Sequence, residues 1–121
     1  MTTVVPTFSK IRGPAGGIDA VVTTWTALAA AGDVGQPLQR TDLADRSVQV
    51  TGTFAGATLV LEGSNDGANY FTLSSPSGAA LSFTAAGLVQ VNQPTAWVRP
   101  RVTLGSGASL TVTMTARRTL R

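Results

Sequence analysis

Cysteine and histidine are both absent from this sequence of 121 residues. Without cysteine the chain can form neither a disulfide framework nor a thiolate metal site. Without histidine it lacks the commonest general base and the commonest metal ligand. These two absences remove most catalytic schemes. We therefore predict a protein that is not an enzyme and that has no catalytic residues, no bound metal and no cofactor.

The carboxylates considered for acid–base chemistry are Asp33, Asp42, Asp45, Glu62 and Asp66. A glycosidase would need two of them on either side of a cleft. Asp66, however, belongs to an Asn-Asp-Gly turn, and Asp42 and Asp45 are each flanked by an arginine. The spacing of a calcium-binding EF-hand loop is also missing. We interpret these acids as turn caps and ion-pair partners.

Charged residues are scarce, at 12% of the chain compared with about 25% in an average globular domain. The net charge of +3 comes from basic residues spread along the sequence, so we expect no nucleic-acid partner. The mean hydropathy is +0.20. Together these values predict a neutral surface that is either covered by small polar residues or buried in an assembly.

Long apolar runs are missing as well. No stretch reaches the roughly 18 consecutive apolar residues of a membrane-spanning helix, so we expect no membrane partner. The N-terminus has no basic segment followed by an apolar run, and we expect no secretory signal. The length suits one domain. The sequence thus predicts a soluble protein with a single compact body.

Proline and glycine are concentrated in the first 20 residues, at Pro6, Gly13, Pro14, Gly16 and Gly17. This composition favours extended chain over a helix or a buried strand. Among them lie apolar and basic residues with which such a segment would dock on a partner: Val4, Val5, Phe8, Lys10, Ile11 and Arg12. We predict an extended N-terminal arm, residues 1–20, followed by a single β-domain, residues 21–121.

Eight short segments have the β-branched, aromatic or alternating pattern of strands. They span residues 21–28, 48–54, 58–64, 70–73, 81–84, 88–92, 97–104 and 110–116. Glycine, proline, asparagine and aspartate separate them, and no segment has a convincing amphipathic helical pattern. This arrangement predicts an all-β fold, an antiparallel β-sandwich or jelly roll of about seven or eight strands.

The connections are predicted from turn-forming residues. Residues 55–57 would join their flanking strands in one hairpin, and residues 65–67 would form a second hairpin. Residues 50–59 also resemble residues 102–110, because both read as strand, Gly-Ala-Thr or Gly-Ala-Ser, strand. We interpret this similarity as two similar hairpins.

Trp97, Arg99 and Arg101 share one face of a predicted strand, opposite Val98 and Pro100. Pro100 cannot donate a backbone hydrogen bond, which predicts an edge strand or a bulge. An aromatic residue with two arginines on one face is typical of protein interfaces. In the alternative interpretation, Trp97 packs under a loop and the arginines pair with neighbouring acids. The sequence leaves both open.

The block from Asp45 to Gly67, DRSVQVTGTFAGATLVLEGSNDG, is followed by Tyr70 and Leu73. With Trp97-Val-Arg-Pro-Arg101 and the closing threonine-rich strand, it resembles small structural proteins encoded among the head genes of tailed bacteriophages. The resemblance extends from Asp33 onward. It implies a virion protein of the capsid decoration or cement type, with a sandwich or jelly-roll fold that clamps adjacent subunits of the shell.

The resemblance also implies partners and a location. The partners would be the major capsid protein and further copies of this chain, as a dimer or trimer. The protein would be made in the cytoplasm of the bacterial host and placed on the outer surface of the capsid, with the neck or tail as the alternative. No catalytic residue carries over. The predicted interface residues are Val4, Val5, Phe8, Lys10, Ile11, Arg12, Trp97, Arg99 and Arg101.

Residues 62–67 with Tyr70 also resemble a hairpin of discoidin-like carbohydrate-binding sandwiches. This second resemblance implies an adhesion module on the virion. In that case Tyr70 or Trp97 is expected to contact the sugar.

Overall fold

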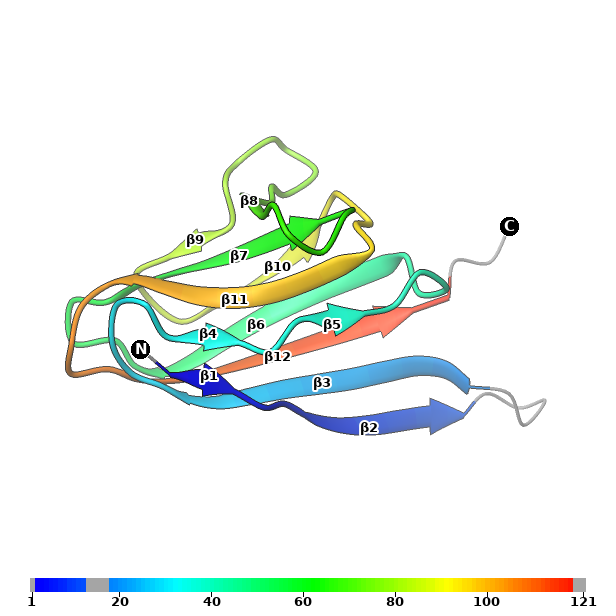
Figure 1. Ribbon diagram of the computed structural model, residues 1–121. Coiled ribbons are helices and arrows are strands. Elements are labelled where there is room, and N and C mark those ends of the chain that lie inside the picture. The colour runs from blue at the N-terminus through cyan, green and yellow to red at the C-terminus, as the bar shows by residue number, and fades with distance from the viewer. Residues whose placement is uncertain (1, 13–17, 119–121) are drawn as a thin grey trace.

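The computed structural model describes residues 2–12 and 18–118, which form twelve β-strands and no helix (Figure 1). The strands are β1 (Thr3–Val4), β2 (Thr7–Arg12), β3 (Ile18–Leu28), β4 (Val34–Gly35), β5 (Leu38–Gln39), β6 (Asp45–Thr53), β7 (Thr58–Ser64), β8 (Phe71–Thr72), β9 (Ser82–Phe83), β10 (Gly87–Val91), β11 (Trp97–Leu104) and β12 (Ser109–Arg117). They stack as two sheets, and every pair is antiparallel except β1 with β4. The predicted all-β sandwich is therefore confirmed. This part of the chain has no helix that could cross a membrane.

The five-stranded sheet has the order β10-β6-β12-β3-β2. Its central strands alternate between buried apolar and outward polar residues, as the sequence pattern predicts. Val48 and Val50 of β6 lie opposite Met114 and Val112 of β12, and all four side chains are fully buried. The inner face of this sheet is one wall of the core.

The seven-stranded sheet has the order β1-β4-β11-β7-β8, with β5 also paired to β11 and β9 to β7. Leu59 and Leu61 of β7 and Val98 of β11 point into the same core. Trp25 of β3 is fully buried between the sheets, and its indole N–H donates to the carbonyl of Gln36, at 2.9 Å. This bond ties β3 to the chain between β4 and β5.

Each of the eight predicted strands is present, as β3 and β6 to β12. The four additional strands are β1, β2, β4 and β5. Three of them have only two residues, too few for a hydrophobic period to be visible. The fourth, β2, lies in the segment for which an arm was predicted.

Two of the predicted hairpins are instead connections between the sheets. Residues 54–57 lead from β6 to β7, and residues 105–108 lead from β11 to β12. The two connections pack closely against each other at Gly105 and Ala57. A side chain on Gly105 would not fit there, because its Cβ would lie 2.8 Å from the Cα of Ala57. Gly105 and Gly56 have φ angles of 106° and 80°, which favour glycine. The other predicted hairpin, from β7 to β8, is confirmed.

Pro100 lies in an inner strand, so its predicted edge position is wrong. It sits opposite Leu61. The backbone N–H of Leu61 donates to the carbonyl of Leu81, and its carbonyl accepts from Leu73, so neither group points toward β11. On the other side of β11, β5 pairs no further than Val98 and β4 pairs at Arg101. The missing N–H therefore faces a gap between two short strands. The register of β11 shifts later, beyond Val102.

Residues 3–12 of the predicted arm are part of the sandwich and not a separate extension. β1 pairs with β4, and β2 pairs with β3 as the edge of the five-stranded sheet. β3 begins at Ile18, so the predicted boundary at residue 20 falls inside a strand. Residues 13–17 lie outside the described residues. Pairing with β2 satisfies backbone groups of β3 that would otherwise form an open edge.

Thr23 gives a test of this packing. Its side chain is fully buried in β3, and its hydroxyl has no hydrogen-bond partner among the described residues. Because valine has nearly the same shape and no hydroxyl, Thr23→Val should raise the free energy of unfolding by about 1 kcal/mol in chemical denaturation.

The matched control is Thr24→Val on the half-exposed outer face of the same strand. It should change the free energy of unfolding by less than about 0.5 kcal/mol. A clear loss of stability in Thr23→Val, with Thr24→Val unchanged, would contradict the described environment of Thr23.

Candidate functional site

Glu62 of β7 holds Arg99 and Arg101 of β11 in an ion-pair cluster on the outer face of the seven-stranded sheet. Arg99 lies directly opposite Glu62 in the register. Its Nε is 2.7 Å from one carboxylate oxygen, and the Nε of Arg101 is 3.1 Å from the other. The Glu62 side chain is only 3% exposed. A single shielded carboxylate therefore positions both guanidinium groups.

The aromatic residues beside this cluster, Tyr70 and Trp97, are partly covered. The guanidinium of Arg99 lies 3.8 Å from the centre of the Tyr70 ring, a cation–π contact, and burial raises the pKa of Tyr70. Trp97 packs under the β7–β8 loop, where a Cβ on Gly67 would be 3.2 Å from its ring. This arrangement matches the alternative interpretation of the strand, with a packed tryptophan and paired arginines. A partner contact through Trp97, Arg99 and Arg101 stays a prediction.

The apolar residues of the N-terminal segment are divided between core and surface. Val4 packs against the core, whereas Val5, Phe8 and Ile11 are 72%, 55% and 51% exposed. All six residues of β2 are exposed, and no described strand pairs with its outer edge. Of the predicted interface residues, Phe8, Lys10, Ile11 and Arg12 thus lie along one open sheet edge, whereas Val4 lies in β1 and packs against the core.

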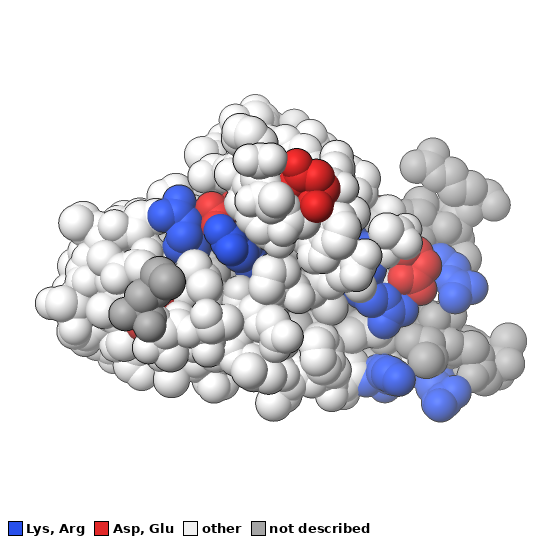
Figure 2. Space-filling model, viewed as in Figure 1, with Lys and Arg blue, Asp and Glu red and all other residues white. Residues whose placement is uncertain are grey.

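A groove of about 390 Å³ runs between β2 and the chain around β5. Its lining residues are Pro6, Phe8, Lys10, Val21, Gln36, Pro37, Leu38, Gln39 and Arg40. Arg40 donates two hydrogen bonds to Asp42, at 3.0 and 2.9 Å, and these raise the pKa of Arg40. Lys10 forms no ion pair with another described residue. In Figure 2 basic side chains gather at the end of the molecule where β2 and β12 finish, while much of the remaining visible face is uncharged.

Arg46, at the start of β6, is a cation buried in the protein, with 3% exposure. Its guanidinium donates to the backbone carbonyls of Leu43 at 2.9 Å, Thr95 at 2.8 Å and Arg40 at 2.5 Å. Burial lowers the pKa of Arg46. Of the two roles predicted for the acids beside Arg40 and Arg46, ion pair or turn cap, the ion pair is not formed at Arg46 among the described residues. The expected pair between Arg40 and Asp42 is present.

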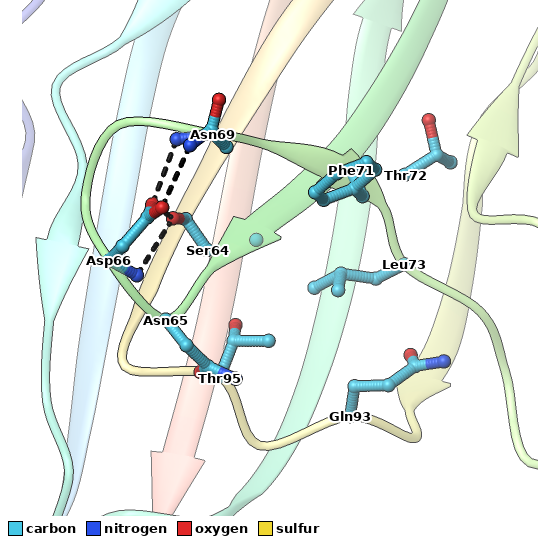
Figure 3. A pocket seen from close by; sticks show the side chains of 10 residues that line it. Ser64, Asn65, Asp66, Asn69, Phe71, Thr72, Leu73, Gln93 and Thr95 are labelled. Atoms are coloured by element: carbon cyan, nitrogen blue, oxygen red, sulfur yellow. Dashed lines mark hydrogen bonds between the residues drawn. The ribbon is translucent and has the colours of Figure 1, made fainter.

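A second hollow, of about 460 Å³, opens at one end of the sandwich (Figure 3). It lies between the β7–β8 loop and the chain that joins β10 to β11, and its lining residues are Gly63, Ser64, Asn65, Asp66, Asn69, Phe71, Thr72, Leu73, Gln93 and Thr95. Hydrogen bonds from the backbone and side chain of Asn69 hold the pKa of Asp66 well below its ordinary value. None of the residues that line this pocket was predicted as a site residue. A signal for it was Phe71, an aromatic residue close to Asn65 and Asn69.

Four of the five carboxylates considered for acid–base chemistry form hydrogen bonds or ion pairs within the fold. Asp33 accepts hydrogen bonds from the backbone N–H groups of Thr2, Ala29 and Ala30, while Asp42, Glu62 and Asp66 have the partners given above. Residues 2–12 and 18–118 contain no group of three or more carboxylates that could hold a metal ion.

No protein-family model and no curated protein sequence matches this chain. Among solved structures, it is similar to a cupin domain from Bordetella pertussis Tohama I, with a TM-score of 0.47, 14% identity and coverage of 96% of this chain and 95% of that chain. It is also similar to Peruvianin-I, a cysteine peptidase from Thevetia peruviana latex, with a TM-score of 0.45, 17% identity and coverage of 94% and 61%. The cupin domain of Schizosaccharomyces pombe Cnp3 gives a TM-score of 0.42 and 10% identity, with coverage of 93% and 60%. These likenesses concern the jelly-roll fold alone, and the chain spans about 60% of two of these three proteins.

Asp33 provides a pH-dependent test of how the N-terminal segment is held. Hydrogen bonds from the backbone of Ala30 and Ala29 lower the pKa of Asp33. A carboxylate with a lowered pKa in the folded state stabilises the protein above its unfolded pKa, and this contribution is lost as the pH falls through the folded pKa. Asp33→Asn should therefore lower the free energy of unfolding by about 1–3 kcal/mol at pH 7, and the difference from wild type should shrink below about pH 4.

Thermal unfolding across this pH range measures the effect. Asp45→Asn, which changes an exposed carboxylate in β6, is the control and should follow the wild-type curve. A difference between Asp33→Asn and wild type that stays constant down to pH 2 would refute this role of the charge.

Proposed function

We propose that this protein is a structural protein of a tailed-phage virion, which decorates the capsid and stabilises it by bridging major capsid subunits. The observation that carries the proposal is the open edge formed by β2, with exposed apolar side chains and a groove beside it. The sequence resemblance to head-encoded phage proteins agrees with it. The protein acts through binding, as an oligomer, at the outer surface of the shell.

The backbone of β2 provides the first element of the binding surface. An unpaired strand edge presents a row of N–H and carbonyl groups that another strand can join. β2 has six residues, none of them proline, whereas both end strands of the seven-stranded sheet, β1 and β8, have two. A strand of a capsid subunit or of a second copy of this chain would extend the five-stranded sheet at β2.

The side chains around β2 provide the second element. Phe8 and Ile11 are about half exposed, and covering them removes apolar surface from water. Phe8 also lines the groove together with Lys10 and Arg40. A partner with an apolar side chain for Phe8 and a nearby carboxylate for Lys10 complements this lining.

The outer face of the five-stranded sheet supports a role within an assembly. Its central part consists of uncharged polar residues, namely Ser47, Gln49 and Thr51 of β6 opposite Thr115, Thr113 and Thr111 of β12. Burying such a face against a neighbour brings no unpaired charge out of water. Many copies on one shell would add modest contacts into a strong reinforcement.

The proposal is tested with capsids assembled without this protein. Purified protein is added, and its occupancy is measured by sedimentation and the rupture of the shells by heating. Saturable binding and a higher rupture temperature are expected. Phe8→Ala with Ile11→Ala should weaken binding at least tenfold, because it removes the exposed apolar side chains of β2.

The matched control is Leu104→Ala, because Leu104 is 60% exposed and lies in β11, in the other sheet from β2. It should bind like wild type. Thermal unfolding of each variant confirms that the fold is retained. Wild-type binding by a folded Phe8→Ala, Ile11→Ala variant would remove β2 from the interface, and failure of the unmodified protein to bind any capsid would refute the proposed function.

A further inference from the structure

The pocket at the end of the sandwich (Figure 3) is separate from β2 and from the groove, since none of its lining residues belongs to either. Its volume of about 460 Å³ falls in the range of about 300–1,000 Å³ that is typical of small-molecule sites. Its position is also typical, at the end of a β-structure where loops meet.

Glycine allows close packing at the base of the pocket. Gly63 lies opposite Phe71 in the pairing of β7 with β8. A Cβ on Gly63 would be 2.3 Å from the Oγ1 of Thr95 and 2.9 Å from a methyl group of Leu73, so a larger residue would displace these two lining side chains. Beside it Phe71 is 72% exposed. An aromatic ring this exposed, next to a hollow, offers a flat apolar surface to a ligand.

The β7–β8 loop is held by hydrogen bonds within itself. The carboxylate of Asp66 accepts hydrogen bonds from the Ser64 hydroxyl at 2.7 Å and from the Asn69 side chain at 2.8 Å. It also accepts bonds from the backbone N–H groups of Ala68 and Asn69, each at 2.9 Å. With these bonds made, Asp66 shapes the loop and is not left over as a charged ligand contact.

The opposite wall is fixed to the rest of the fold. The amide of Gln93 is bonded to Ser74 through both its oxygen and its nitrogen, at 2.8 and 2.7 Å. The N–H of Ala96 donates to the Oδ1 of Asn65 at 3.1 Å, which joins the two walls directly. A preformed site loses little conformational entropy on binding.

One free donor faces the pocket, the amide nitrogen of Asn65, which takes part in no hydrogen bond among the described residues. The amide oxygen of Asn69 and the hydroxyl of Thr72 point away from the hollow (Figure 3). Apart from Asp66, the polar side chains of the lining are uncharged amides and hydroxyls. No lysine or arginine lines the pocket, so an anionic ligand would find no counter-charge there.

We propose that this pocket binds a neutral saccharide. A pyranose ring has one face of C–H groups, which packs on an aromatic ring such as Phe71, and a rim of hydroxyls that both donate and accept hydrogen bonds. The free donor of Asn65 and the uncharged amides and hydroxyls of the lining complement that rim. This binding site is independent of the proposed capsid contact. It also differs from the sugar contacts expected through Tyr70 and Trp97, since Arg99 covers one ring and a loop packs on the other.

The experiment uses the purified chain on an array of neutral oligosaccharides of glucose, galactose, mannose and xylose, with sialylated and uronic-acid oligosaccharides printed alongside. Retention of at least one neutral saccharide is expected. Titration with that saccharide should show an affinity at least tenfold lower for Phe71→Ala. Asn65→Asp, which keeps the shape and the acceptor for Ala96 and removes the amide donor, should weaken binding by a smaller factor.

Leu88→Ala is the matched control, because Leu88 is 66% exposed in β10 and does not line the pocket. It should bind like wild type. Amide NMR shifts of the unmodified protein on adding the saccharide should centre on Gly63, Asn69 and Thr95. An array on which no neutral saccharide is retained, retention of acidic saccharides only, equal binding by Phe71→Ala, or shifts centred elsewhere would each overturn the proposal.

Discussion

The buried guanidinium of Arg46 is the contact on which both candidate surfaces depend. A buried cation is unfavourable unless its hydrogen-bonding capacity is satisfied, and here it donates to three backbone carbonyls. One of these belongs to Arg40, which lines the groove next to β2, and another to Thr95, which lines the pocket. A single side chain thereby connects the loops that shape both surfaces to the start of a central strand.

Three acidic side chains are likewise held by hydrogen-bond or ion-pair partners within the fold. Glu62 engages Arg99 and Arg101, Asp33 caps the turn that receives the N-terminus, and Asp66 is enclosed by its own loop. The exposed features are mainly apolar or neutral: the edge of β2, the threonine-rich sheet face and the Phe71 ring. A molecule with this distribution interacts through shape, apolar contact and neutral hydrogen bonds, which is consistent with both the proposed assembly role and saccharide binding.

The sequence predicted the strands well because alternation of apolar and polar residues is a local property, as β6 and β12 illustrate. It failed where the outcome depends on the partner of a strand. The Gly-Ala motifs near Gly56 and Gly105 indicate a change of direction, but not whether the next strand joins the same sheet. Arg46 has the same parity in β6 as the buried Val48 and Val50, and this spacing indicates that its side chain points inward. Its three carbonyl partners, however, come together only in the fold. The pocket likewise joins segments about thirty residues apart, such as Asn65 and Ala96.

The proposed binding of this sandwich to a phage shell through the β2 edge can be seen by cryo-electron microscopy of the virion, with and without this protein. We expect density for a sandwich of this size on the outer surface, at the junction of major capsid subunits, with β2 and its groove against a neighbouring chain. Virions that lack such density, or density in which the β2 edge faces solvent, would contradict it.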